Sequence, residues 1–250
     1  NAANSIQRIN PNSRVLNSTI RKTVMNFESE KLIVSKEVLY LGDMASYKKS
    51  KFRNIEFKDQ EKHVMGSLPD AFPNQQLISF DYNKEQANSV LGDTLFHSFK
   101  YEVSSPFTKV ANLSVFKLPF SFLKTGLNIL QSKQRKTNLC LWDSPLDLDY
   151  ESEKFQIILP KGKKLTELPQ AVTISNKYFD YSLTFSKARN ECIVSRECKY
   201  KTLDIPAEEF NDFKNAMIKV GEAESVQLAL QDGEEEPEVI PTSKAKKGKK

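Results

Sequence analysis

Apolar and polar residues alternate along much of this chain, and a period of two predicts β-strands. Residues 13–41 predict two long strands joined by a polar turn at Glu28–Lys31. The clearest alternation runs from Leu95 to Val103. Roughly eight short strands between residues 90 and 230 are the density expected of a β-sandwich. Strands are also expected at 77–82, 110–116, 137–141, 155–159, 178–183, 192–194 and 226–230.

Two stretches show helical spacing instead. Residues 43–65 carry apolar residues spaced like one helix face or two short helices, and Asp43 is the expected N-cap. A second helix is predicted over residues 206–221, because Pro206 suits a first helical turn and Gly221 is placed to end a helix. The apolar stripe that this helix would lay on a sheet comprises Phe210, Phe213, Met217 and Val220.

These elements predict a fold that is mainly β with minor α. We expect a β-hairpin and helical connector over residues 1–75, followed by an antiparallel β-sandwich over residues 76–231 that carries the C-terminal amphipathic helix. Residues 232–250 are expected to form a disordered charged tail, because they lack the apolar residues that a packed core requires.

The charge of the chain is concentrated at its end. The net charge is +5, but five lysines lie within residues 244–250, and the rest of the chain holds 32 basic and 32 acidic residues. A folded nucleic-acid binder carries its basic excess as a patch on the domain, so nucleic acid is not the partner we expect. A tail of this kind can still tether a chain to phosphate or to an acidic surface. These lysines are Lys244, Lys246, Lys247, Lys249 and Lys250.

No run approaches the roughly 20 apolar residues that cross a bilayer, so no transmembrane segment is expected. The first residues, Asn1–Ser5, show neither an initiator Met nor a signal-peptide pattern. We therefore expect a processed product or a piece of a longer polypeptide.

Three cysteines leave the redox compartment open, because an odd number says little about it. Cys192 and Cys198 lie in a strand-forming segment, and six extended residues span about 20 Å. A disulfide joins Cα atoms roughly 4.4–6.8 Å apart, so this pair is not expected to bridge. Cys140 could reach one of the two across a sheet, but free buried thiols are the main expectation.

The sequence assigns no residue a catalytic, cofactor-binding or metal-binding role. His97 lies on an alternating strand, where a hydrogen-bonded structural histidine is expected, and His63 lies in a charged, solvated stretch. Cys140 has no flanking base, which favours an inert core thiol. The chain has no metal-ligand spacing and no phosphate-cradling glycine loop. An acidic cluster is interpreted as a solvated loop or edge, with a weak calcium site as the alternative, and comprises Asp143, Asp147, Asp149 and Glu151.

An ordered set of weak motifs resembles the C-terminal module of large bacterial transglutaminase-like envelope proteins. In those proteins a β-domain of unknown function precedes a transglutaminase-like core, and a second β-domain of unknown function closes the chain. The resemblance covers roughly residues 30–231. Its motifs are Ser144–Leu148, Ile157–Gly162, Leu168–Pro169, Ile193–Arg196, Ile205–Phe210, Phe213 and Leu228–Leu230, with Gly42–Ala45, Lys49 and Lys51 in a linker-like region.

The resemblance implies a place in the periplasm or outer-membrane region of a Gram-negative envelope. The family's Cys-His-Asp triad belongs to the central core, which no stretch of this chain matches, so the resemblance implies no catalytic residue here. Asp93–Leu95 is similar to a short acceptor motif for O-glycosylation in some bacterial periplasms. The N-glycosylation triplets Asn17–Thr19 and Asn112–Ser114 have meaning only in a secreted eukaryotic protein.

Three functions follow from these observations. The first is a non-catalytic accessory domain that binds protein or glycan partners in the envelope, through sheet edges or the sheet face opposite the helix at 206–221. The second is membership of a larger transglutaminase-like or peptidase enzyme whose Cys-His-Asp core lies upstream. The third is phosphate or nucleic-acid binding through the lysines of residues 244–250.

Overall fold

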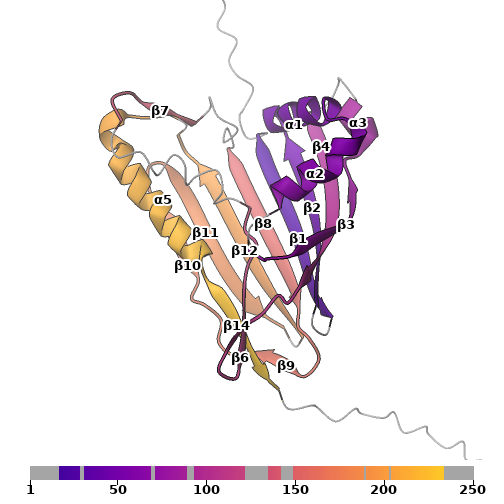
Figure 1. The fold of residues 1–250 in the computed structure, drawn as a ribbon. Helices are drawn as coiled ribbons and strands as arrows, with labels where there is room; N and C mark the ends of the chain where they lie inside the picture. Colours follow the sequence, from indigo (N-terminus) through magenta and orange to yellow (C-terminus); the bar gives the residue numbers. More distant parts are fainter. Residues whose placement is uncertain are drawn as a thin grey trace, which may run out of the picture.

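The computed structural model describes residues 17–28, 31–68, 71–88, 93–121, 135–141, 149–188, 190–202 and 204–233. Long strands form one large sheet, with α5 over one half, α1 to α3 near the other half, and a small sheet at one end (Figure 1). The helices are α1 (Asp43–Arg53), α2 (Phe57–Ser67), α3 (Lys84–Asn88), the 3-10 turn η3 (Ala207–Glu209) and α5 (Phe210–Glu224). The strands are β1 (Ser18–Glu28), β2 (Lys31–Leu41), β3 (Gln75–Asp81), β4 (Thr94–Ser104), β5 (Thr108–Val110), β6 (Leu113–Lys117), β7 (Leu139–Cys140), β8 (Tyr150–Ile158), β9 (Lys163–Leu165), β10 (Val172–Ser175), β11 (Phe179–Lys187), β12 (Glu191–Tyr200), β13 (Asp204–Ile205) and β14 (Gln227–Asp232).

The large sheet has the strand order β10-β11-β12-β8-β1-β2-β4-β3. Its neighbouring strands are antiparallel except β1 and β8, which run parallel with Thr23 opposite Phe155. The expected class, mainly β with minor α, is confirmed. The sheet is mixed rather than wholly antiparallel, because an alternating pattern locates strands but does not specify which strands pair.

The hairpin β1–β2 lies in the middle of this sheet. β1 pairs with β2 and β8, and β2 also pairs with β4. Strands from both sides of the expected boundary between residues 75 and 76 therefore share one sheet. An isolated hairpin is marginally stable in water, and pairing along both edges gives its backbone groups their hydrogen-bond partners.

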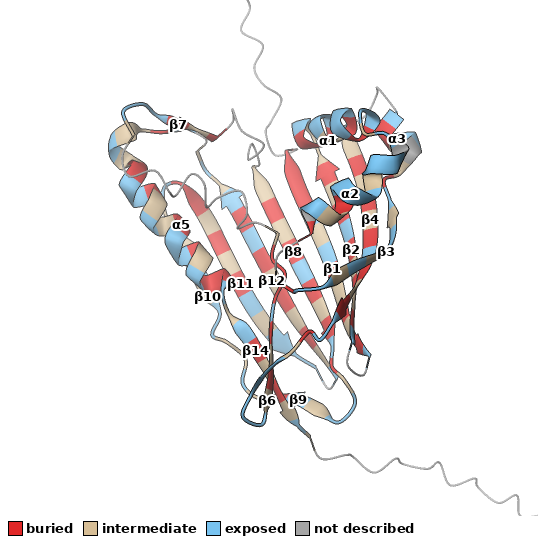
Figure 2. Cartoon of the chain, viewed as in Figure 1, coloured by how far each residue is buried: buried red, intermediate tan, exposed pale blue. Residues whose placement is uncertain are grey.

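One face of the large sheet, called the inner face below, is buried, while the outer face is partly exposed. Figure 2 shows this as buried positions that alternate with exposed or intermediate ones along each long strand. In β4, every second residue from Leu95 to Val103 is buried, as the alternation predicts, whereas Lys100 between them is exposed. The inner face is therefore fixed by a period of two in the sequence.

Helices and a second sheet cover the inner face. The predicted stripe of α5 is confirmed, since its four apolar residues are buried, and the ring of Phe213 meets those of Tyr178 and Phe179 edge-on. α1 buries Phe52 on the side of β4. The small sheet has the order β5-β6-β14-β9, and Phe116 of β6 lies 5.0 Å from Phe27 of β1 between ring centroids.

The predicted helices form, but two of their ends differ from expectation. The stretch at 43–65 folds as α1 and α2, and the N-cap of α1 is Gly42 with a φ of 67° rather than Asp43. α5 continues past Gly221 to Glu224. Ala223 and Glu224 are buried, and their packing outweighs the roughly 1 kcal/mol that Gly221 costs inside the helix.

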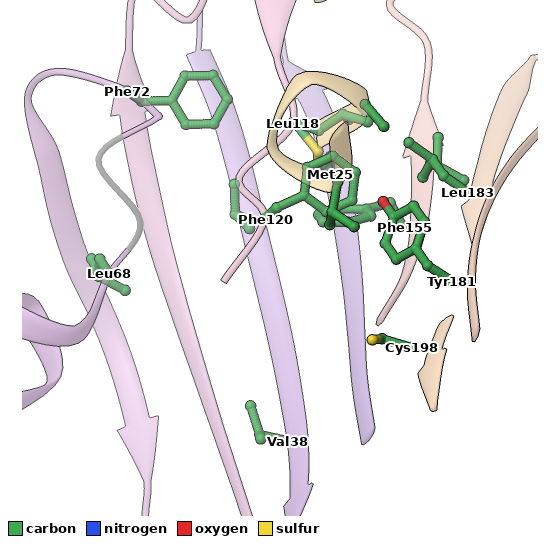
Figure 3. Close-up of a cluster of buried hydrophobic side chains, with 14 of the residues drawn as sticks. Met25, Val38, Leu68, Phe72, Leu118, Phe120, Phe155, Tyr181, Leu183 and Cys198 are labelled. Carbon is green, nitrogen blue, oxygen red and sulfur yellow. The ribbon is translucent and has the colours of Figure 1, made fainter. Parts of the chain in front are cut away.

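The centre of the core lies where β8 and β1 meet under the covering segments. Figure 3 shows Phe155 beside Met25 and Phe120, side chains that come from distant parts of the chain. Phe155 is fully buried, and its ring meets Phe120 edge-on at 5.1 Å. The parallel seam of the sheet thus lies within the hydrophobic core.

Candidate functional site

Six ionisable side chains gather on the inner face, where apolar residues otherwise predominate. Two come from β8, one each from β1, β2 and β12, and one from the last residue of α5. All of them are buried except for a small exposed fraction of the β1 arginine. This cluster, called the charge network below, comprises Arg21, Lys36, Glu151, Glu153, Arg196 and Glu224.

Strand register brings the charge network together. Glu153 of β8 lies opposite Arg196 of β12 on one side and opposite Arg21 of β1 on the other. Lys36 of β2 lies opposite Thr23, two residues along β1 from Arg21. Because residues two apart on a strand share a face, all of these side chains project from the inner face.

The contacts within the network pair every carboxylate with a cation. Lys36 Nζ donates to Glu153 Oε1 at 2.6 Å, and Arg196 Nη2 donates to Glu151 Oε2 at 3.0 Å. Arg21 Nη2 lies 3.5 Å from the other oxygen of Glu151. Burial alone would raise the pKa of Glu153, but the facing cations Lys36, Arg21 and Arg196 outweigh it and lower that pKa. Glu153 is therefore ionised at neutral pH.

Glu224 connects α5 to the network. Its carboxylate pairs with Nε of Arg196 and accepts a hydrogen bond from the Tyr181 hydroxyl at 3.3 Å. The pKa of Glu224 is raised to about 7, chiefly because the carboxyl group is buried. Arg196 acts to lower this pKa, whereas the like charges of Glu153 and Glu151 raise it further. The contact between the end of α5 and the sheet thus depends on pH near neutrality.

We expect the stability of the protein to show this titration. The unfolded chain releases the Glu224 proton near pH 4.5, whereas the folded protein holds it to about pH 7. Raising the pH through that window therefore lowers the stabilisation from this group, by about 3 kcal/mol in total. Unfolding free energies from urea titrations at pH 5, 6, 7 and 8 should show this decrease in the native chain but not in Glu224→Gln.

The comparison with Glu224→Gln is needed because His97 acts in the opposite direction. Burial, with Lys48, Arg21 and Lys36, lowers the pKa of His97 to about 3, so stability gained from the neutral ring rises as the pH rises to about 6.5. The difference between the two chains isolates Glu224. Glu222→Gln, an exposed change in the same helix, should keep the native pH profile. Equal slopes for Glu224→Gln and the native chain would contradict the assignment.

A cavity of about 200 Å³ borders the charge network beneath α1 and α2. Arg21 and Lys36 line one part of it, and Lys48 of α1 enters from above the sheet. His63 and His97 also line it. Lys36 additionally donates a hydrogen bond to Ser121, another lining residue. The cavity is thus bordered mainly by basic and aromatic side chains.

The histidines and cysteines occupy separate places. His97 lies on β4, four strand positions from the cysteines of β12, or about 19 Å at the usual spacing between strands. It is buried, as expected, and its ring packs against those of Tyr40 and Phe52, but the expected hydrogen bond is not formed at Nδ1, which has no partner among the described residues. His63 is exposed, as expected. Neither Cys192 nor Cys198 therefore has His97 beside it as a general base.

None of the three cysteines forms a disulfide, and for the pair Cys192 and Cys198 this is what their spacing predicts. Burial raises the pKa of the Cys192 thiol to about 11 and that of the Cys198 thiol to about 12. Cys140 is half-buried rather than in the core, and its Sγ lies 3.6 Å from Oδ1 of Asp204. Its environment differs from the expected one because β7 and β13 form a separate two-stranded sheet.

The acidic cluster and the glycosylation triplets are only partly described. Glu151 is buried in the charge network, which corrects its interpretation as part of a solvated loop, while Asp143 and Asp147 lie outside the described residues. Asn17 is buried, and its side chain accepts a hydrogen bond from the backbone of Met44. Asn112 lies in an exposed turn. The lysines of residues 244–250 lie outside the described ranges.

Within the described residues, no group of three or more His, Cys, Asp or Glu side chains is arranged to hold a metal ion. Across the same ranges, no helix has both the length and the hydropathy needed to span a bilayer.

A second feature lies at the β3 edge of the large sheet. In the described structure β3 pairs only with β4, and the register shifts between Leu77 and Ser79, leaving Ile78 51% exposed. A groove of about 680 Å³ runs beside this strand. The groove, called the edge groove below, is lined by Gln60, Glu61, Leu77, Ile78, Ser79, Phe80, Asp81, Tyr82, Asn83 and Glu85.

Sequence reasoning missed the charge network, although the sequence contains a signal for it. Lys36 lies between Val34 and Val38 at the inward position of its strand, and Arg196 lies between Val194 and Cys198 in the same way. A charged residue at an inward position must be paired, because burying an isolated charge is costly. Charges that interrupt an apolar period of two therefore point to buried partners.

Comparison with known families places one part of the chain. Residues 114–230 match a family described as a domain of unknown function with a solved structure, DUF3858. No match is found among curated proteins. The matched stretch is slightly less than half of the chain and includes Glu151, Glu153, Arg196 and Glu224. Arg21 and Lys36 precede it, so the charge network is completed by residues outside the match. The carboxyl half of the chain is thus similar to DUF3858.

Proposed function

We propose that this chain is a non-catalytic accessory domain that binds an extended segment of a protein partner along β3. The observation that carries this proposal is the edge strand β3 with its exposed Ile78 and the adjoining edge groove. An edge strand offers unpaired backbone groups to an added strand, and side-chain pockets beside it supply specificity. The register shift at Ile78 limits addition to a short segment, which suits a specific partner better than indiscriminate sheet extension.

The lining of the edge groove indicates the chemistry of the partner. Leu77, Ile78 and Phe80 provide apolar surface, while Glu61 and Asp81 provide negative charge. A segment that alternates apolar residues with Lys or Arg would complement both. We therefore propose a basic, amphipathic peptide segment as the ligand.

Two observations support a non-catalytic role and an envelope setting. The thiols of Cys192 and Cys198 are kept protonated by burial, and His97 is several strands away from both. The resemblance to transglutaminase-like envelope proteins supports a position beside such a core, in the periplasm or at the outer membrane. In that setting the partner would be another envelope protein, or another segment of the same polypeptide.

Site-specific photo-cross-linking in cells of the native source tests the proposal. A photoreactive amino acid at Ile78 should give a stoichiometric adduct, and mass spectrometry should place the cross-link on a basic, amphipathic segment. The same amino acid at Ile218, which is also exposed at 40% but lies on α5, is the matched control. Ile78→Glu should abolish copurification of that partner by adding charge to the apolar strip, whereas Ile218→Glu should not.

Equal labelling from both positions would refute the proposal, as would retention of the partner by Ile78→Glu. Circular dichroism and thermal unfolding of both variants establish that the fold is kept, because each substitution lies at an exposed position.

A further inference from the structure

The cavity beneath α1 and α2 lies apart from Ile78 and plays no part in the proposed partner binding. Its lining shares only Tyr82 with the edge groove, and its charged side chains are basic rather than acidic. Three cationic side chains line this space of about 200 Å³, those of Arg21, Lys36 and Lys48. Such a convergence of like charge needs negative charge to offset it.

The carboxylates of the sheet account for two of these cations. Lys36 pairs with Glu153, and Arg21 pairs with Glu151. Lys48 instead lies over the ring of Tyr40, with Nζ 5.4 Å from the ring centroid, and no carboxylate of the described residues forms an ion pair with it. Burial lowers the pKa of Lys48 to about 8, with Lys51 and Arg21 adding to the effect, so the amine is still mostly protonated at pH 7. The cavity therefore holds an excess positive charge.

Two buried polar atoms at the cavity have no hydrogen-bond partner within the described structure. They are Nη1 of Arg21 and Nδ1 of His97, and the side chains of both residues line the space. His97 is 7% exposed, so bulk water does not satisfy its ring. Leaving a buried polar group without a hydrogen-bond partner costs about 1–3 kcal/mol. A ligand oxygen that accepts a hydrogen bond from Nη1 of Arg21 would remove that cost.

The remaining walls are apolar. Phe52 and Tyr82 stack with ring centroids 4.0 Å apart, and Val64 and Phe99 line the same space. An apolar cavity of about 150 Å³ accommodates benzene, so about 200 Å³ has room for a ring or short chain together with one carboxylate. A bare inorganic ion would leave these walls without an apolar partner.

We propose that this cavity binds a small organic carboxylate whose hydrocarbon part contacts Phe52, Val64 and Phe99, and whose oxygens accept from Lys48 and Arg21. The ligand offsets the excess charge, satisfies the Arg21 guanidinium and fills the apolar space. Its carboxylate also lies close enough to His97 to change the magnetic environment of that ring.

Benzoate is the probe for a direct test, with benzamide as its uncharged analogue and inorganic phosphate as the anion without a hydrocarbon part. The protein contains two histidines, so ¹³C labelling of histidine gives two ring signals that are simple to follow by NMR. Benzoate should shift the His97 signal in a saturable titration. Benzamide should bind at least tenfold more weakly, because it lacks the charge that Lys48 and Arg21 recognise.

Substitutions locate the site. Lys48→Met should weaken benzoate binding about tenfold, which corresponds to about 1.4 kcal/mol. Lys51→Met removes one charge from the same helix but not from the cavity wall, and should change the affinity less than twofold. Ile78→Glu should leave benzoate binding unchanged, so this proposal and the peptide-binding proposal fail separately. The two histidine signals of each unliganded variant report whether the fold is retained.

Three results would overturn the carboxylate site. Equal affinity for benzoate and benzamide would mean an apolar cavity without charge recognition. A saturable response to phosphate alone would mean an inorganic oxyanion site, and no response of His97 to any of the probes would mean that the cavity is closed to ligands.

Discussion

Replacing Arg196 with Leu is expected to lower the free energy of unfolding by about 3–5 kcal/mol. Arg196 is fully buried and contacts three carboxylates, those of Glu151, Glu153 and Glu224. Its removal weakens the balance around Glu151 and Glu153 and leaves Glu224 without a cation, so that at pH 7 this carboxyl must either remain as an unpaired buried charge or take up a proton that the unfolded chain does not hold, and both are costly. Urea unfolding at pH 7, followed by circular dichroism, measures the effect.

The double variant Arg196→Leu with Glu224→Leu distinguishes charge from packing. If the cost comes from the unpaired carboxylate, removing Glu224 as well should recover 1–3 kcal/mol of the loss. Lys199→Leu, an exposed change on the same strand, should stay within about 0.5 kcal/mol of the native chain. If Arg196→Leu unfolds at the same urea concentration as Lys199→Leu, the charge network does not stabilise the fold.

Truncating Phe155 to Ala should destabilise the protein by a similar amount, about 3–5 kcal/mol, for a different reason. Phe155 is completely buried between Val194 on β12 and Thr23 on β1. The substitution also removes the edge-on contact of its ring with Phe120. The cost is the lost burial of the ring together with the cavity left behind. Chemical unfolding with an unchanged m-value should show a lower midpoint.

Lys154→Ala is the matched control, because Lys154 is the adjacent residue of β8 and faces outward. Its effect should remain within about 0.5 kcal/mol. A Phe155→Ala variant as stable as Lys154→Ala would show that the seam between β8 and β1 is not packed as described. Phe155→Leu should fall between the two, since it keeps part of the buried apolar volume.

The positions of the elements follow from local patterns in the sequence. The alternation at Leu95–Val103 predicts β4 and its buried face, and the three-four-three spacing from Phe210 to Val220 predicts the buried stripe of α5. These predictions succeed because each depends on residues within a few positions of one another. The end of α5 is less predictable, because Glu224 is held by Arg196, a residue on a distant strand.

The pairing of strands and the candidate sites could not be read from such patterns. Alternation in β1 and β8 does not reveal that they are parallel neighbours, since each strand would show the same pattern beside another partner. The cavity combines Arg21, Lys48 and His97 from three separate elements, and no spacing in the sequence relates them. The inward positions of Lys36 and Arg196 were the available signal, and they indicate buried partners without identifying them.

The parallel seam between β1 and β8 also constrains the order of events on the ribosome. About 130 residues separate Ser18 from Tyr150, so at typical synthesis rates the first strand is made on the order of 10 s before its neighbour. During that interval the nascent hairpin has one long unpaired edge, which other chains can bind. Lys22 and Lys154, exposed on the outer face at the same level of these two strands, place like charges along this seam. A chain released before residue 150 would therefore be a substrate for holding chaperones rather than a smaller folded domain.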